Sequence, residues 1–399
     1  MIRMEEWMED ILQDEEDDCF NLRLCLASNW HTPPEILEAL AAMDEIRVRE
    51  AVAQNPHTPP RALERLAMDT HLDILLALAV NEAAPPFVLA SLVHHPYAEI
   101  KTAVAENPNT PEEVLLKLAR EQDMEVREAV ALNPTTSLVT LVLLAEDESE
   151  WVRGAVAENP NTPNALLYEL AHDERPIVRN TVVYNPNSTP DILHFLSKDA
   201  DEHIRELVAE NPRTSLHDIE NLMRDAACRP AIATREDIPA ALLERLSSDR
   251  DVNVRINVAS NPLTPPRVLE TLGADHHTIV RTSVLENPTT PPSLLEAFAC
   301  DEDRWIRDSL AKNESTPPHV LEMLAEDAQY HVRAGVALNA STPPRVLGTL
   351  ARDRRREVRK AVVQNANTPP QILEELMHDK SVEVRRECEE RITATESHL

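Results

Sequence analysis

Glycine is almost missing from this sequence, which has only 4 glycines in 399 residues. Phosphate-cradling loops and dinucleotide fingerprints need closely spaced glycines, so the sequence argues against most nucleotide chemistry. Positive charge is also scarce, because 39 Lys and Arg stand against 70 Asp and Glu, for a formal net charge of −31. Affinity for a phosphate backbone depends on clustered Lys and Arg, so we expect no nucleic-acid partner.

Cysteine is infrequent and scattered, with no CxxC pair among Cys19, Cys25, Cys228, Cys300 and Cys388. This spacing predicts neither a disulfide framework nor a thiolate metal site, and no other motif calls for a cofactor. The first residues lack the apolar core of a signal peptide, and no apolar run approaches the ~20 residues of a membrane span. We therefore expect a soluble, cytoplasmic protein with no membrane partner, no metal and no cofactor.

An internal repeat dominates the sequence. One series of asparagines recurs at steps of 26 residues, and a second series resumes the same step after a gap of 50: Asn29, Asn55, Asn81, Asn107, Asn133, Asn159, Asn185, Asn211, and then Asn261, Asn287, Asn313, Asn339 and Asn365. The gap holds two repeats with two residues deleted, and Arg235 stands where the missing Asn is expected. A period of 20–50 residues indicates a solenoid, so we predict 14 repeats over residues 29–390, with a shortened repeat at 211–234.

Each repeat reads as a pair of short helices. In the repeat that starts at Asn261, Thr264 is a candidate N-cap, and the prolines after it suit a first helical turn. Leu269 and Leu272, three residues apart, mark one buried face of the first helix. A turn leads to a second, shorter helix that carries Val280 and Val284 and ends at the next Asn-Pro, because a residue before Pro leaves the α region. The sequence predicts an all-α fold without strands, in which neighbouring repeats must stack to bury their apolar faces.

The two ends differ from the repeats. Residues 1–28 comprise half a repeat preceded by an acidic segment whose apolar residues share one helical face: Met4, Trp7, Met8, Ile11 and Leu12. We interpret this segment as a helix that caps the first repeat, since terminal repeats need a polar outer face; an acidic helix that binds a partner is the alternative. Residues 391–399 form a polar tail that we expect to fray.

Two charged columns run through the repeats. Most repeats carry an Asp in the turn and an Arg six residues later, as in Asp147 and Arg153, or Asp275 and Arg281. A single catalytic or metal site needs a unique constellation, whereas a feature of every repeat belongs to the stacking. Because Arg forks onto carboxylates, we expect each Asp to bond within its own or the adjacent repeat. The Asn column is expected to satisfy the backbone of the turn between repeats.

Several segments resemble the leucine-rich repeat variant family: Asn107-Pro-Asn-Thr-Pro111, Leu115 to Ala119, and Val126-Arg127 to Val130-Ala131. The resemblance recurs over nearly the whole chain and implies a right-handed superhelical solenoid of α-helices alternating with short α- or 3₁₀-helices, without a β-sheet. The spacing of Asp and Val-Arg also resembles HEAT repeats, whose ladder is structural. One type of family member binds an iron–sulfur centre through an N-terminal cysteine cluster. Only Cys19 and Cys25 lie near this N-terminus, so we do not carry the cluster over.

Residues that differ between repeats are the candidates for function. Large side chains occupy positions of the second helix that are expected to point outward: Trp151, Ile177, Tyr184, Ile256, Ile279, Trp305, Tyr330 and His331. Trp and Tyr dominate binding hot spots, so we predict these residues as partner-binding; packing against the next repeat is the alternative. A second outward position carries glutamates that favour a basic partner, or merely form a solvated face: Glu106, Glu158, Glu210 and Glu286.

Irregular repeats lie around Leu75 to Lys101, where His95 replaces the usual Asp, and around Asp225 to Arg235. Adjacent histidines at 94–95 and 276–277 lack the spacing of a zinc site. A basic stretch that includes Arg352, Arg354, Arg355 and Arg356 stands out in this acidic chain and is a candidate dock for an acidic partner.

The sequence contains no recognisable catalytic signature, so we expect no enzyme. The function that it favours is a non-catalytic scaffold that binds a protein or peptide along the solenoid surface. The alternatives are a regulatory or metal-responsive accessory protein related to the iron–sulfur-containing members and, less favoured by the charge, a HEAT-like nucleic-acid enzyme.

Overall fold

The computed structural model describes the backbone of residues 17–396 and the side chains of residues 20–392. This part of the chain contains 29 α-helices and no strand. It divides into two compact units, Met1–Ser215 and Leu216–Leu399, and the division falls within the shortened repeat. The 14 helix pairs confirm the all-α solenoid and the repeat count, whereas a right-handed superhelix stays a prediction. The acidic segment with Met4, Trp7 and Ile11 lies outside the described residues.

In the first unit, the first helices of the repeats are α3 (Pro34–Leu40), α5 (Pro60–Leu66), α7 (Pro86–Leu92), α9 (Glu112–Leu118), α11 (Leu138–Ala145), α13 (Asn164–Leu170) and α15 (Pro190–Leu196). The second helices are α4 (Ile46–Gln54), α6 (Leu72–Val80), α8 (Ala98–Glu106), α10 (Met124–Leu132), α12 (Glu150–Glu158), α14 (Pro176–Tyr184) and α16 (Glu202–Glu210). The half repeat α2 (Asp17–Ser28) precedes them.

In the second unit, the first helices are α17 (Leu216–Leu222), α19 (Ala240–Leu246), α21 (Pro266–Leu272), α23 (Pro292–Phe298), α25 (Pro318–Leu324), α27 (Pro344–Leu350) and α29 (Pro370–Leu376). The second helices are α18 (Cys228–Thr234), α20 (Val252–Ser260), α22 (Thr278–Glu286), α24 (Arg304–Lys312), α26 (Tyr330–Leu338), α28 (Arg356–Gln364) and α30 (Val382–Glu396). The two-residue deletion falls in α18, which has 7 residues where most second helices have 9.

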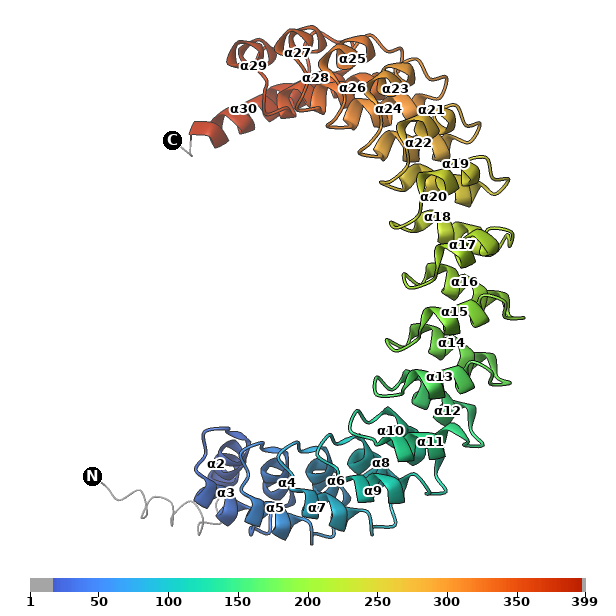
Figure 1. Ribbon diagram of the computed structural model, residues 1–399. Coiled ribbons are helices and arrows are strands. Elements are labelled where there is room, and N and C mark those ends of the chain that lie inside the picture. Colours follow the sequence, from blue (N-terminus) through green and yellow to red (C-terminus); the bar gives the residue numbers. More distant parts are fainter. Residues whose placement is uncertain (1–16, 397–399) are drawn as a thin grey trace. The chain divides into compact units, whose positions relative to one another are not determined.

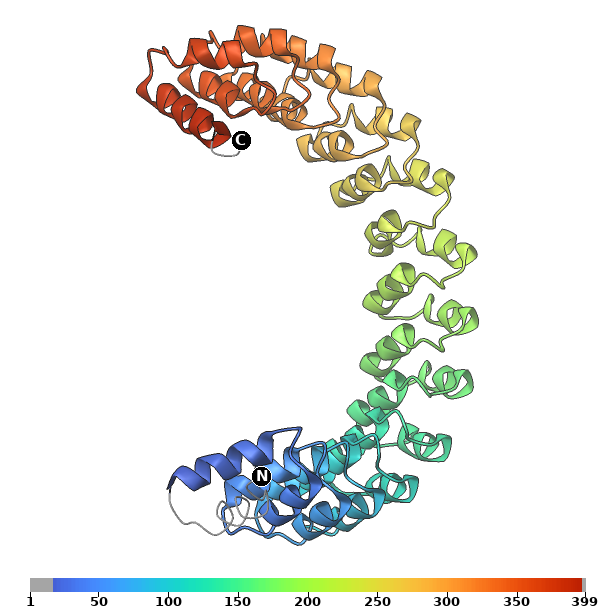
Figure 2. The ribbon, with the colours of Figure 1, turned by 90° about the vertical axis from the view of Figure 1, so that its left-hand side faces the viewer.

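The relative helix lengths differ from the expectation that the second helix is the shorter. First helices typically have 7 residues and second helices 9, and both are α-helices, with no 3₁₀-helix among the described residues. Within each unit the first helices form one row and the second helices another (Figures 1 and 2). Consecutive second helices pack along one another, whereas consecutive first helices make few contacts. Each unit therefore curves, with its row of second helices on the inner side of the curve.

Apolar residues of both rows meet in a continuous core in each unit. Leu166, Leu167 and Leu170 of α13 and Val152 and Val156 of α12 are all buried. Burying a side chain of this size contributes about 1.5–3 kcal/mol relative to leaving it exposed. No helix of 7 or 9 residues is stable alone, so this burial between neighbours, rather than helix propensity, maintains the fold.

The asparagine column joins consecutive turns. The Nδ2 group of Asn159 donates to the carbonyl oxygens of Ala131, at 2.6 Å, and Asn133, at 2.9 Å, which lie at the end of α10 and in the turn after it. Its Oδ1 atom accepts the backbone N–H of Asn161 at 2.9 Å. Asn159 is 1% exposed, and its amide satisfies backbone groups that would otherwise be buried without partners. The expected role of this column in the turn is confirmed.

The column's last position holds an arginine. Arg391 lies one period after Asn365, and its Nη1 group donates to the carbonyl oxygens of Val363 and Asn365. The helix does not end at this position as the earlier second helices do, and α30 continues to Glu396. The polar segment that was expected to fray from residue 391 is thus helical as far as residue 396, and residues 397–399 lie outside the described part.

The threonine before the proline pair has a different role from the expected N-cap. Thr264 Oγ1 donates to the carbonyl oxygen of Val258 at 2.5 Å, at the end of the preceding α20, and Thr162 bonds Val156 in the same way at 2.6 Å. The N-cap residue of α21 is Pro265, which has no side-chain hydrogen bond. The threonine hydroxyl therefore satisfies a carbonyl at the C-terminus of one helix rather than an N–H at the start of the next.

The charged columns form a ladder between consecutive repeats. Arg153 donates from Nε and Nη2 to the two carboxylate oxygens of Asp173, at 2.6 and 3.0 Å, and from Nη1 to the carbonyl oxygen of Asp147 at 2.8 Å. The same bidentate pair, 20 residues apart, recurs at Arg127–Asp147, Arg179–Asp199, Arg255–Asp275, Arg281–Asp301, Arg307–Asp327, Arg333–Asp353 and Arg359–Asp379. The structural interpretation of both columns is confirmed.

The ladder shifts the acidity of its carboxylates. Burial alone raises the pKa of Asp69, but hydrogen bonds from Arg49 and His71 outweigh it and lower that pKa to about 2. Asp173 and Asp353 have pKa values below their ordinary range by the same balance, in which the arginine and a backbone N–H overcome burial. These carboxylates are therefore charged at neutral pH and serve the stacking of repeats.

We call each Arg–Asp pair of the ladder a rung. In the irregular repeats of the first unit, only one rung has lost its pair of opposite charges. Lys101 and Glu121 occupy the Arg and Asp positions and pair at 2.9 Å, so that rung keeps its charges. The preceding rung has Leu75, which is buried, and His95, which is half-buried. Both charged partners are replaced together, and no buried charge is left without its counterion at this rung.

Candidate interaction surface on the second helices

The predicted partner-binding residues share one face of the second helix. We number each second helix backwards from the Asn that directly follows it, so that the residue before this Asn is position 1. Position 1 carries Tyr184 and the four glutamates, and position 5 carries Ile256. Position 8 carries Trp151, Ile177, Ile279, Trp305 and His331. Positions 8, 5 and 1 are spaced by three and four residues, so they line one side of an α-helix. Tyr330 lies at position 9, beside this face.

Exposure divides these residues into two groups. Trp151, Trp305, Ile279 and Tyr184 are 52%, 60%, 60% and 65% exposed. His331 is exposed too, as are Glu106, Glu158, Glu210 and Glu286. Ile177, Ile256 and Tyr330 are half-buried. The structure thus presents most of the predicted residues to solvent on the row of second helices, whereas these three also serve packing.

The exposed residues occur in both units without forming one cluster. In the first unit, Tyr184 of α14 lies near Glu210 of α16, since partial burial and then the charge of Glu210 raise the pKa of Tyr184 above its ordinary value. In the second unit, Trp305 and His331 line one cavity of about 200 Å³ between α24 and α26. This cavity also contains Arg304, Asp308, Lys312 and Gln329, none of which the sequence singled out.

A separate exposed apolar face lies on a first helix. Leu138, Val139, Val142 and Leu143 of α11 are 39–68% exposed. Nearby in the same row of helices, the rings of Tyr168, His172 and Phe195 lie 4.0–6.1 Å apart, centroid to centroid. Sequence reasoning missed this face because the apolar run of α11 resembles a buried helix. Aligning α11 with the equivalent positions of α9 and α13 was the signal that could have separated its outward residues from its buried ones.

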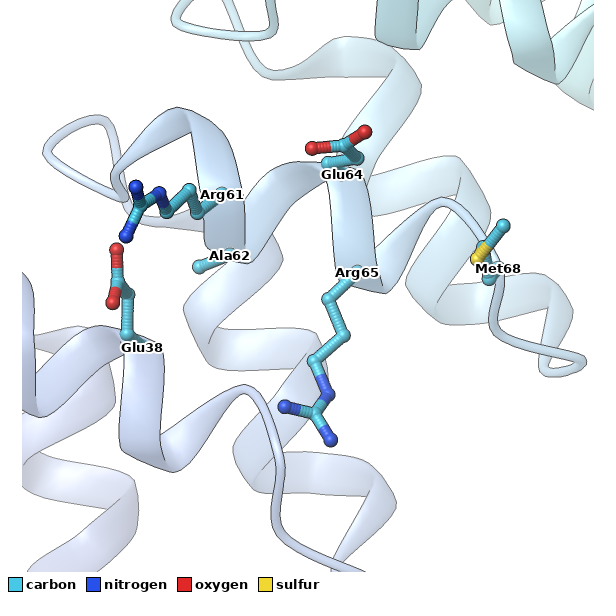
Figure 3. Close-up of a pocket in the computed structure, with 6 residues that line it drawn as sticks. All are labelled: Glu38, Arg61, Ala62, Glu64, Arg65 and Met68. Carbon is cyan, nitrogen blue, oxygen red and sulfur yellow. The ribbon is translucent and has the colours of Figure 1, made fainter.

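Another hollow, on first helices of the first unit, is open to solvent. This hollow of about 410 Å³ lies over α3 and α5, where the side chains of Arg61 and Glu38 point toward one another (Figure 3). Met68 lies at its edge and is 86% exposed. Among residues 17–396 there is no group of three or more His, Cys, Asp or Glu side chains arranged to hold a metal ion. None of the helices in this range combines the length and apolar character of a membrane span.

Two family profiles match parts of the chain. The profile of the leucine rich repeat variant matches residues 46–71, 330–355 and 356–381, each of which is one period of the repeat. The profile of the leucine rich repeat variant domain matches residues 152–212. The matched segments are leucine-rich repeat variants, and they share the 26-residue period of the other repeats. The family resemblance seen in the sequence is thereby confirmed, and the matches fall in both units.

Solved structures with similar folds include another leucine-rich repeat variant, described as having a novel repetitive structural motif. It is 27% identical, with 61% of this chain and 87% of that chain covered and a TM-score of 0.40. An engineered protein is 15% identical over 96% of this chain and 97% of its own, with a TM-score of 0.19. Yeast importin-beta is 13% identical over 93% of this chain and 54% of its own, with a TM-score of 0.30. No curated protein matches the sequence.

In these leucine-rich repeat variants, the invariant and the variable positions of one helix have separate places. Val152 and Val156 of α12 face the core, and Arg153 belongs to the ladder. Trp151 and Glu158 of the same helix are exposed on the row of second helices. The repeat leaves this outward face free to differ from one repeat to the next.

Proposed function

We propose that this protein is a non-catalytic scaffold that binds a protein or peptide partner along its row of second helices. The observation that carries the proposal is the exposure of two tryptophans, Trp151 and Trp305, at the same repeat position in the two units. Aromatic residues are only 3% of the chain, and an exposed Trp gains much free energy on burial in an interface.

The inner side of each unit suits an elongated partner. Consecutive second helices pack side by side, so their solvent-facing positions form a continuous surface within each unit. Solenoids use such surfaces for binding. The glutamates at position 1, such as Glu158 and Glu210, are exposed and favour a partner with basic residues opposite them. Tyr184 and Ile279 add exposed apolar area on the same face.

The test is affinity capture of partners from the native host lysate, read by mass spectrometry, with wild type and a Trp151→Glu/Trp305→Glu variant. A charge at both positions is expected to remove the partner, with at least a ~100-fold loss of affinity for two hot-spot residues, while circular dichroism stays unchanged.

Trp30→Glu is the matched control, because Trp30 is 67% exposed but lies in a turn outside the row of second helices. Retention of the partner by Trp30→Glu, and its loss from the double variant, supports the proposal. Equal retention by both folded variants contradicts it.

A further inference from the structure

The end of the second unit reverses the charge of the chain. Residues 328–382 contain nine Lys and Arg against five Asp and Glu, a net charge of +4 in a chain whose net charge is −31. Arg333 and Arg359 pair within the ladder. Arg354, Arg355 and Lys380 are exposed, and no ion pair joins any of them to another residue of the described part.

Aromatic rings continue from these cations across neighbouring helices. The guanidinium of Arg355 lies over the ring of Tyr330 at 5.1 Å, and the rings of Tyr330 and His331 are 3.9 Å apart. His331 and Trp305 then line the same cavity between α26 and α24. We call the continuous set formed by Trp305, Tyr330, His331, Arg354, Arg355 and Lys380 the aromatic–basic strip.

The cavity at one end of the strip has a size and chemistry that suit one side chain. Its volume of about 200 Å³ is below the ~300–1,000 Å³ of typical small-molecule pockets. The lining carboxylate of Asp308, which is 9% exposed, accepts from Lys312 Nζ at 2.7 Å through Oδ2, whereas Oδ1 is buried and has no hydrogen-bond partner among the described residues. A buried acceptor without a donor costs about 1–3 kcal/mol, so a group with an N–H or O–H is favoured here.

A glycine maintains the space beside this carboxylate. A Cβ atom at Gly335 of α26 would lie 3.0 Å from Ala311 Cβ and 3.6 Å from Asp308 Oδ1. With no side chain at this position, α26 and α24 approach closely, and the carboxylate faces a gap rather than a methyl group.

The other end of the strip suits carboxylates. A hollow of about 560 Å³ at the starts of α28 and α30 has a single carboxylate in its lining, that of Glu357, and five cations: Arg354, Arg355, Arg356, Arg359 and Lys380, with Ser381 beside them. Arg356 is engaged by Glu357 and Glu383, and Arg359 pairs within the ladder, which leaves the other three cations to meet a partner. Arginine binds carboxylates with two parallel hydrogen bonds, and Arg354, Arg355 and Lys380 form no ion pair with the described residues.

We propose that the aromatic–basic strip binds an acidic peptide segment that carries a tryptophan or tyrosine. The aromatic side chain enters the cavity between Trp305 and His331 with its N–H or O–H toward Asp308, and the neighbouring carboxylates contact Arg354, Arg355 and Lys380. This inference rests on the proposed scaffold function and names the chemistry of one partner segment. A short segment is favoured over nucleic acid because a long polyanion would extend over the acidic remainder of the chain.

Fluorescence anisotropy with the full-length protein tests the proposal. The probe is a labelled synthetic peptide of Asp and Glu residues around one tryptophan, and a matched peptide has serine in its place. We expect the tryptophan peptide to bind about tenfold more tightly than the serine peptide. The variant Arg354→Glu/Arg355→Glu/Lys380→Glu is expected to weaken binding by at least about tenfold, because none of these residues belongs to the ladder.

The matched control, with the same change in charge on first helices of the same unit, is Arg245→Glu/Arg267→Glu/Arg345→Glu. Its binding is expected to fall by no more than about twofold, since these arginines lie on first helices outside the strip and exposed charges that do not touch the peptide are screened. Equal losses in both triple variants, or no binding to wild type, overturn the proposal. So does a labelled single-stranded RNA that binds through the strip more tightly than the peptide.

These results separate the inference from the scaffold function. If the acidic peptide fails to bind while lysate capture still depends on Trp151 and Trp305, the inference falls and the scaffold stands. If the peptide binds through the strip while the Trp151→Glu/Trp305→Glu variant captures the same partners as wild type, the proposed scaffold surface is contradicted instead.

Discussion

The two sides of a single second helix, α12, behave in opposite ways along the solenoid. On one side lie buried valines and Arg153, which makes the bidentate contact with an Asp that occurs in eight rungs of the ladder. On the other side Trp151 is exposed, and the same position carries Arg47, Asp73 and Glu99 in earlier repeats. What stays constant from repeat to repeat serves stacking, and what changes on the exposed face is available for recognition.

Breaking one rung is the largest disturbance we expect. Arg153→Ala leaves Asp173, whose side chain is 8% exposed, without its counterion and removes a donor from the carbonyl oxygen of Asp147. The expected loss is about 3–5 kcal/mol, the cost of removing one partner of a buried pair. Urea denaturation followed by circular dichroism measures it.

The control for this rung is Arg175→Ala, because Arg175 pairs with Glu150 at the surface and is 53% exposed. Solvent screens an exposed pair of this kind, so its loss is expected to change the stability far less than the loss of Arg153. Similar losses for the two variants would show that the ladder is no more than surface electrostatics.

Acid is expected to weaken the ladder with a defined sign. Because Asp69 has a pKa of about 2 in the folded chain against an ordinary value of 3.8, its contribution is complete above pH 3.8 and is lost as pH falls through about 2. The loss is on the order of 2 kcal/mol for this rung. Urea midpoints of wild type and Arg49→Met between these pH values isolate the effect.

Arg49→Met removes the arginine that lowers this pKa, so its stability is expected to depend less steeply on pH than that of wild type. Parallel curves for the two proteins would mean that other carboxylates, and not this rung, respond to acid in this range.

The smallest expected effect comes from rebuilding the missing rung. Leu75→Arg/His95→Asp restores both partners where the first unit lacks them, and we expect a stability within about 1 kcal/mol of wild type, since a buried ion pair and an apolar pair are often equivalent. Leu75→Arg alone is expected to cost about 3 kcal/mol, because the buried charge then has no carboxylate. A double-mutant cycle measures the coupling, and additive effects would contradict the paired replacement.

The repeat itself was readable because the side chain of Asn159, like its equivalents, bonds carbonyl groups at the turn one period earlier, which ties the residue type to the period. The role of Thr264 was misassigned because a threonine before a proline pair satisfies the sequence pattern of an N-cap equally well, and only the geometry shows that its hydroxyl reaches back to Val258. Arg391 stands in register with the asparagines, so its role was predictable from the period.

The candidate surface was only partly predictable. Trp151 and Trp305 follow from register, since position 8 lies opposite the buried valines. Tyr330 is half-buried because position 9 brings its ring against the neighbouring His331 and against Arg355 of the next second-helix region, and the contact with Arg355 depends on how the repeats stack. The cavity beside Asp308 depends on how closely α24 and α26 approach at Gly335, and no pattern within one repeat encodes that distance.

Thermal unfolding and lysate capture measured together on two variants test the separation of stacking and recognition most directly. Trp151→Glu/Trp305→Glu is expected to unfold at the wild-type temperature and to capture no partner. Arg153→Ala is expected to unfold at a lower temperature but to retain the partner below its transition. A folded tryptophan variant that keeps the partner, or one that loses it only by losing thermal stability, would contradict the account.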